Sequence, residues 1–188
     1  MPQRYAILVC GWPPAPVVEQ IGGYGSHIER CLRMHDDEEW VHFDCEDGRD
    51  LPRGEDLDGF DVVIVSGSKH DAHSPARWVK DVGALAKRAV DGKAQRVLGI
   101  CFGAQLLAHV LGGESGPAAV GWELGTRTVS LDRSKCVDLP YASRASSDDL
   151  VVMQCHRDQI LTLPPGAERL GASPRCENEI FAIGANVL

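Results

Sequence analysis

The most constraining feature of this sequence is a short apolar segment typical of a buried strand, followed almost at once by an apolar segment typical of a helix. Residues 96–100, Arg-Val-Leu-Gly-Ile, have the length and composition of a buried strand, and residues 104–111 form an apolar helical stretch that ends at Gly112-Gly113. Only Cys101-Phe102-Gly103 separates the two. Strand, reversal and helix follow with almost no loop, which predicts a nucleophile elbow with Cys101 at its tip.

The residues around Cys101 fit the requirements of such an elbow. Gly99-Ile-Cys-Phe-Gly103 is a G-x-S-x-G pattern with cysteine in the serine position. A tight reversal strains the backbone of the central residue, and side chains at Gly99 or Gly103 would collide with their surroundings. A helix N-terminus favours the thiolate, so we expect a lowered pKa and Cys101 as the most readily alkylated of the seven cysteines. The Phe102 amide would point at a developing oxyanion.

A lone motif of this kind also fits an inert thiol between packing glycines, so its context matters. A second glycine turn, Ser66-Gly67-Ser68, ends the nearly continuous apolar segment 60–66. A strand that is apolar on both faces is typical of a parallel sheet. In such a sheet the two turns would meet at the carboxyl edge, where ligands bind.

The remaining pattern predicts an α/β fold with a mostly parallel sheet between helical layers. Further strands are expected at 5–10, 39–44, 126–131 and 150–155, and amphipathic helices at 28–34 and 76–89. A Pro-rich loop is expected after the first strand. Residues 179–183 and 186–188 look like the two arms of a hairpin around Gly184-Ala185.

Composition and charge exclude several classes of function. The chain has 188 residues, enough for one domain, and a formal charge of −8, which disfavours binding to nucleic acids and anionic membranes. Its N-terminal apolar run is too short for a signal peptide or a membrane span. Seven cysteines without a CxxC pair argue against a disulfide framework and a zinc site. We therefore expect a cytosolic protein without a metal or cofactor.

At this point several motifs resemble a known family. Residues 99–105, Gly-Ile-Cys-Phe-Gly-Ala-Gln, resemble the nucleophile motif of class I glutamine amidotransferase domains, and residues 65–71 with Trp78 resemble their oxyanion loop. Four further features most resemble the plant γ-glutamyl peptidases of that superfamily, over effectively the whole chain: Tyr24 after Gly22-Gly23, residues 66–72, residues 155–158 and residues 176–184.

The resemblance implies a three-layer, flavodoxin-like sandwich that forms a single domain over residues 1–188. It further implies Cys101 as nucleophile and the backbone amides of Ser68 and Phe102 as oxyanion hole. The residues that would contact or support a small γ-glutamyl substrate, such as a glutathione conjugate or a γ-glutamyl peptide, are Gly67, Gln105, Trp122 and His156. For Trp122, packing before a strand is the more common alternative.

One departure from the family pattern bears directly on activity. The family's triad is completed by a His-Pro-Glu motif after a strand that here would begin near Asn186, whereas the printed sequence stops at Leu188. We therefore expect a domain that is incomplete at its C-terminal end and impaired in proton transfer. Among the seven histidines His156 is the best placed substitute, although a strand-end histidine bonded to a neighbouring loop is the more common arrangement.

Three functions from different classes remain open on the sequence. The chain could be a γ-glutamyl hydrolase that forms a thioester on Cys101. It could be a glutaminase module that supplies ammonia to a synthetase partner. It could also be a degenerate family member that binds ligands or partners without catalysis, and the absent His-Pro-Glu favours this third possibility.

Overall fold

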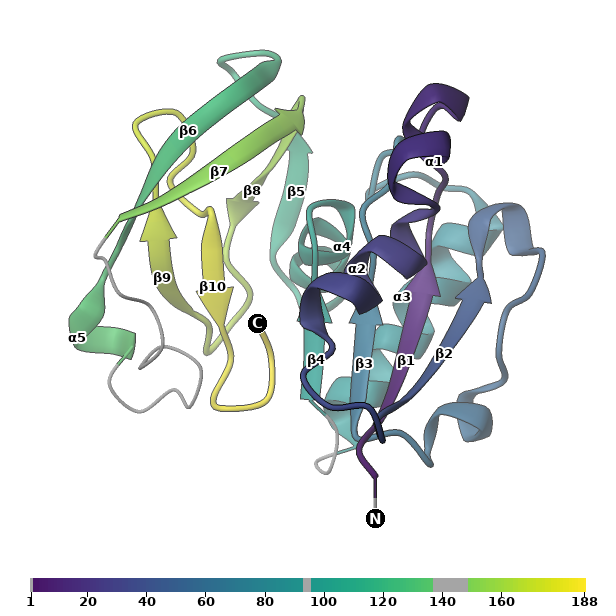
Figure 1. Cartoon of the computed structure of the whole chain (residues 1–188). Helices are drawn as coiled ribbons and strands as arrows, with labels where there is room; N and C mark the ends of the chain where they lie inside the picture. The colour runs from purple at the N-terminus through teal and green to yellow at the C-terminus, as the bar shows by residue number, and fades with distance from the viewer. Residues whose placement is uncertain (1, 93–95, 137–148) are drawn as a thin grey trace.

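Four parallel strands form the sheet that carries the elbow. The computed structural model describes residues 2–92, 96–136 and 149–188 (Figure 1). The strands are β1 (Arg4–Val9), β2 (Glu39–Asp44), β3 (Val62–Val65) and β4 (Arg96–Gly99). Their order is β2-β1-β3-β4, and all three pairings are parallel. The predicted parallel sheet is confirmed, with the elbow strand β4 next to β3, the strand that leads to the glycine turn.

Helices cover both faces of this sheet. They are α1 (Ala15–Ile21), α2 (Tyr24–Leu32), α3 (Arg77–Asp91) and α4 (Phe102–Val110), with 3₁₀ turns η1 (Glu46–Gly48) and η2 (Gly54–Leu57). The short α5 (Arg133–Cys136) lies instead in the antiparallel part of the molecule (Figure 1). Ala6 and Leu8 of β1 face the core shared with α3 and α4, whereas Ile7 and Val9 pack with Ile28 of α2. Successive side chains of β1 thus point to opposite faces of the sheet, and each face is covered by a helical layer, which gives the predicted three layers.

Helix α1 lies where a loop was expected. Its first turn contains Pro16, which is tolerated there because the N–H that proline lacks has no partner at a helix start. None of the helices among the described residues combines the length and the apolar character needed to cross a membrane.

Six further strands form antiparallel sheets beside the first sheet. They are β5 (Glu114–Pro117), β6 (Glu123–Leu131), β7 (Asp149–His156), β8 (Asp158–Thr162), β9 (Glu168–Ala172) and β10 (Ile180–Ala182). One sheet has the order β10-β9-β6-β7, and β5 pairs with β8. The long β6–β7 pair confirms the strands expected at 126–131 and 150–155, and Figure 1 shows this region beside the α/β part.

The C-terminal residues correct the predicted hairpin. Strand β10 pairs with β9, and a single antiparallel bridge, Ile183 with Val187, joins the two supposed arms. Asn186 and Leu188 instead accept hydrogen bonds from backbone N–H groups of β4, at 2.7 Å from Val97 and 2.8 Å from Gly99. The segment therefore runs parallel to β4 and extends the main sheet, so the two predicted arms meet at one bridge and not along a paired hairpin.

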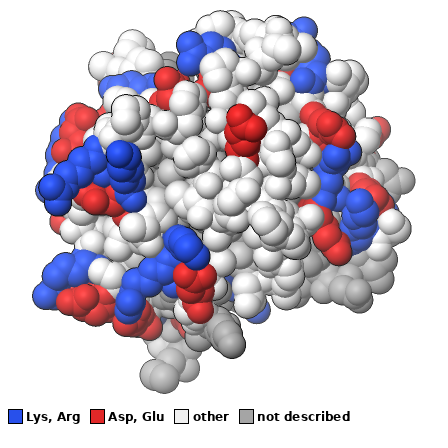
Figure 2. All heavy atoms as spheres, turned by 180° about the vertical axis from the view of Figure 1, so that it is seen from behind, with Lys and Arg blue, Asp and Glu red and all other residues white. Residues whose placement is uncertain are grey.

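The surface charges are mixed in sign. Figure 2 shows the back of the molecule, where basic side chains lie next to acidic ones around an area that is largely free of charge. Ion pairs on and beside α3, such as Lys87 with Asp91 and Arg88 with Asp58, are of this kind. The described residues on this face form no broad basic area of the kind that phosphate backbones require.

Candidate active site

Cys101 occupies the strained tip of the predicted elbow. Strand β4 ends at Gly99 and α4 begins at Phe102, so Cys101 is the N-cap residue, with φ 53° and ψ −106°. A positive φ is uncommon outside glycine and persists where the surroundings enforce it. A Cβ atom on Gly99 would lie 2.6 Å from the Ala104 nitrogen, and one on Gly103 would collide with the Val65 carbonyl oxygen. The glycines therefore have the role that the sequence predicted.

The environment of the thiol differs from the expectation. Burial raises the pKa of Cys101, and the hydrogen bond from the Phe102 backbone amide lowers it by less. Nearby Cys155 and Asp158 also disfavour a negative charge. Although Cys101 as a residue is exposed, the net effect on its thiol is a raised pKa, which is opposite to the lowered pKa expected from the helix N-terminus.

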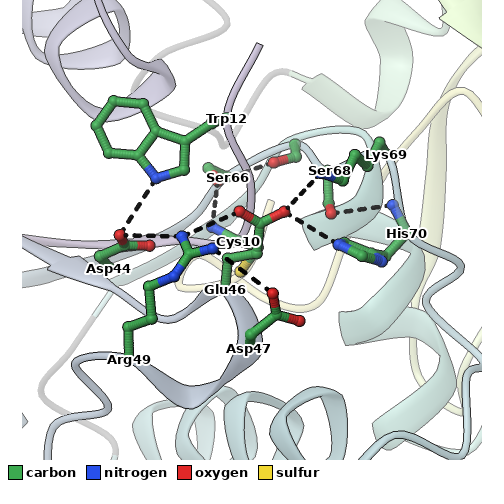
Figure 3. Close-up of polar contacts among 11 residues, drawn as sticks. Cys10, Trp12, Asp44, Glu46, Asp47, Arg49, Ser66, Ser68, Lys69 and His70 are labelled. Atoms are coloured by element: carbon green, nitrogen blue, oxygen red, sulfur yellow. Dashed lines mark hydrogen bonds and ion pairs between the residues drawn. The ribbon is translucent and has the colours of Figure 1, made fainter. Parts of the chain in front are cut away.

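The glycine turn after β3 lies against Cys101, as predicted. A Cβ atom on Gly67 would be 3.8 Å from the Cys101 Cβ. The buried Ser66 hydroxyl fixes the start of the turn: it accepts a 2.9 Å hydrogen bond from the Cys10 amide and donates one of 2.9 Å to the Gly67 carbonyl (Figure 3). Ser68 is thereby held at the carboxyl edge of the sheet, beside Cys101.

Two cavities open on either side of Cys101, and both are also lined by Gln105, His156 and Asp158. The first, of about 310 Å³, extends toward the antiparallel sheet. The second, of about 420 Å³, lies under the glycine turn. Residues that line only the second are Pro14, Tyr24, Ser68, Lys69, His70, Asp71, Trp122, Cys155 and Arg157. The structure thus brings together five of the seven predicted site residues at one cavity, with Gly67 and Phe102 flanking Cys101.

Three of the four residues predicted to contact the substrate have side chains that are held in different ways. Gln105 is buried, and its Nε2 donates a 2.7 Å hydrogen bond to the Asp158 carbonyl, which joins α4 to β8. Trp122 is 61% exposed, so its indole is available at the cavity rim and is not core packing. The Nδ1 atom of His156 is buried without a hydrogen-bond partner among the described residues.

Three other histidines already contact carboxylates. His70 bonds Glu46, His42 pairs with Glu29, and His73 lies 3.5 Å from an Asp158 oxygen. None of these contacts prepares an imidazole for proton transfer at the thiol.

One group of side chains offers donors that a metal ion could use. Ligand atoms of Asp71, His73 and Asp158 all lie within 4.8 Å of one another. Arg157, however, already contacts both carboxylates, at 3.2 Å to Asp71 and 3.0 Å to Asp158. A guanidinium thus neutralises the charge that a divalent cation would need, and the group is better described as an ion-pair network between the loop after β3 and the start of β8.

The structure also identifies a buried acid behind the site that the sequence did not single out. Glu46, in η1, is 3% exposed and contacts Lys69 and His70, which follow Ser68 (Figure 3). The only sequence signal was its place just after β2, at the carboxyl edge of a parallel sheet. The contact between Glu46 and His70 spans 24 residues of sequence and cannot be read from local spacing.

Comparisons with known proteins agree with this geometry. Residues 22–185 match the family model described as glutamine amidotransferase class-I. The chain is 32% identical over 186 residues to gamma-glutamyl peptidase 2 of Arabidopsis thaliana, covering 99% of this chain and 73% of that protein. It is 32% identical over 190 residues to gamma-glutamyl peptidase 3 of the same plant, covering 97% and 72%. A glutamine amidotransferase of Thermotoga maritima shares the fold, with a TM-score of 0.77 at 24% identity, covering 100% of this chain and 74% of that one.

Proposed function

Because the chain belongs to the class I glutamine amidotransferase family, we propose that it is a γ-glutamyl hydrolase with Cys101 as nucleophile. The observation that carries the proposal is the strained elbow, which directs Cys101 into a cavity of about 420 Å³ beside a glycine turn. That volume suits a small molecule. The similarity to two proteins named gamma-glutamyl peptidase supports a γ-glutamyl bond as the target.

The proposed reaction is acyl transfer through a thioester. The Cys101 thiolate attacks the γ-carbonyl carbon, and the electron pair of the C=O bond moves to the oxygen, where the Ser68 and Phe102 amides would stabilise it. Collapse of this intermediate breaks the bond to the leaving amine, which departs with a proton. Water then attacks the thioester, releases glutamate and restores the thiol.

Both signs of charge at the cavity suit a zwitterionic γ-glutamyl group. Lys69 and Arg157 could face its α-carboxylate, and Asp71 could face its α-ammonium. Trp122 and Tyr24 leave apolar surface for a leaving group such as a peptide or a glutathione conjugate. Gln105 and His156 complete the wall next to the nucleophile.

For proton transfer, the described residues offer no base as well placed as the family's histidine. The resembled family uses a His-Pro-Glu motif, which the printed 188 residues do not contain. We therefore infer that a polypeptide limited to these residues forms and hydrolyses the thioester slowly.

A reducing compartment fits this chemistry. All seven cysteines are free, and the nucleophile requires a reduced thiol. We propose the cytosol as the site of action and a small molecule as the partner.

The test is detection of the acyl-enzyme by intact-protein mass spectrometry. The chain is incubated separately with a γ-glutamyl dipeptide and with glutamine, with Cys101→Ala as control. A glutamyl adduct from the dipeptide that is absent in the control is the expected result. Reaction with glutamine alone would support an ammonia-supplying glutaminase instead, and the absence of any adduct from an activated γ-glutamyl anilide would favour a non-catalytic family member.

A further inference from the structure

The carboxylate of Glu46 is buried behind the glycine turn and is fully engaged. Its Oε1 lies 3.0 Å from His70 Nε2 and 3.1 Å from Lys69 Nζ, and its Oε2 lies 3.2 Å from an Arg49 guanidinium nitrogen (Figure 3). A buried charge without such partners would be strongly unfavourable. Two of the three partners come from the loop that begins at the glycine turn.

These contacts hold the segment that carries the Ser68 amide. Lys69 and His70 follow Ser68 directly, and the His70 backbone amide donates a 3.1 Å hydrogen bond to the Ser68 hydroxyl. Glu46 itself is anchored at the end of β2, on the far side of the sheet from the antiparallel strands. The carboxylate therefore connects a rigid strand end to a loop that has no strand or helix of its own.

His70 also connects this loop to Phe102, the residue that follows Cys101 in the elbow. The His70 ring packs edge-on against Trp78, with centroids 5.1 Å apart, and Trp78 stacks on Phe102 at 6.0 Å. Phe102 supplies the second amide of the proposed oxyanion hole. Both donors are therefore packed against one continuous set of side chains, which begins at Glu46.

We propose that Glu46 is a positioning residue for acylation of Cys101: through Lys69 and His70 it holds the Ser68 amide where the oxyanion develops. This inference rests on the proposed function. An oxyanion donor lowers the barrier only when it already has the correct position before the reaction begins. A displacement of even about 1 Å reduces its contribution to the rate.

The protonation state of Glu46 is compatible with this role. Burial alone would raise its pKa, but the hydrogen bonds from His70 and Lys69 and the charges of Lys69 and Arg49 together outweigh that effect, and the pKa lies below the ordinary value. The carboxylate is therefore ionised at neutral pH. A glutamine in its place would keep the size of the side chain but would lose the charge that attracts Lys69.

The experiment compares two reactions of the same thiol in Glu46→Gln and in a matched control. Acylation by γ-glutamyl p-nitroanilide develops an oxyanion, whereas alkylation by iodoacetamide does not. The control is Glu38→Gln, since Glu38 is also buried but lies before β2, where it accepts hydrogen bonds from Trp40 and the Met34 amide. We expect Glu46→Gln to lower the ratio of acylation to alkylation rates by about tenfold to a hundredfold, below the effect of losing a whole donor, and Glu38→Gln to leave it unchanged.

The outcomes separate this inference from the proposed function. An unchanged ratio in Glu46→Gln, with acylation intact in the unsubstituted chain, would overturn the role of Glu46. If the unsubstituted chain is not acylated at all, the proposed function fails, and amide hydrogen exchange over residues 67–71 decides whether Glu46 holds the loop. Exchange that is faster in Glu46→Gln than in Glu38→Gln supports positioning, and equal exchange refutes it.

Discussion

Leu188 and Gly99 are joined by a backbone hydrogen bond of 2.8 Å, so the last residue of the printed sequence lies beside the strand that leads to the nucleophile. Val187 pairs with Val97 in the parallel direction. A chain continued in this register would run alongside Ile100 and Cys101. Residues carried by such a continuation would thus approach the elbow along β4.

The first prediction follows from this register. The 188-residue polypeptide should hydrolyse a γ-glutamyl dipeptide slowly or not at all, and a version extended by a tail with His-Pro-Glu should turn over at least about a hundredfold faster, the scale of general-base catalysis. The measurement is glutamate release, with Cys101→Ala in the extended chain as control. Equal rates for the short and extended chains would mean that His156 or another histidine acts as the base.

The second prediction concerns the pH dependence of the thiol. Because the pKa of Cys101 is raised, its thiolate fraction at neutral pH is smaller than that of an ordinary thiol and grows as the pH rises. The iodoacetamide rate of Cys101, followed by peptide mass spectrometry, should therefore continue to increase after that of N-acetylcysteine has levelled off. A midpoint below that of N-acetylcysteine would restore the expectation drawn from the helix N-terminus.

The third prediction tests the close approach of Gly103 to the backbone of Val65 beneath the elbow. Gly103→Ala would drive a methyl group into the Val65 carbonyl, so we expect it to lower the free energy of unfolding by about 3 kcal/mol or more. Gly116→Ala is the control, since its Cβ would meet only the end of the Leu161 side chain at 3.4 Å. Urea denaturation measures both, and similar losses would contradict this account of Gly103.

The fourth prediction addresses the contact between α4 and β8. Gln105→Leu removes the 2.7 Å hydrogen bond to the buried Asp158 and should destabilise the chain by about 1–3 kcal/mol. Gln3→Leu, which removes only an exposed hydrogen bond with Tyr5, should stay within about 0.5 kcal/mol. A thermal or urea comparison that shows no difference would mean that Gln105 does not hold the two elements together.

The sequence predicted the elements that local patterns define. Strand β2 was expected at its observed bounds, and β1, β3, α3 and α4 within a few residues of theirs, because each has a clear apolar period or a glycine boundary. Strands β5, β8 and β9 were not expected, since their short, mixed sequences form strands through pairing with distant partners.

The candidate site likewise contains features that local sequence motifs predict and contacts that they do not. Cys101 and its glycines could be predicted because the elbow is a local motif, and the Ser66–Ser68 turn because it ends an apolar strand. The contact of Glu46 with His70 and the stacking of Trp78 on Phe102 could not, since each joins residues far apart in sequence. The direction of the Cys101 pKa shift depends on burial, which only the folded structure reveals.

The backbone conformation of Cys101 also limits how this scaffold could change its chemistry. At φ 53° a residue with a branched β-carbon is severely strained, so threonine is excluded as an alternative nucleophile. Serine has the same unbranched Cβ and fits the same space. Among hydroxyl and thiol side chains, the backbone at this tip therefore permits exchange between cysteine and serine, and not with threonine.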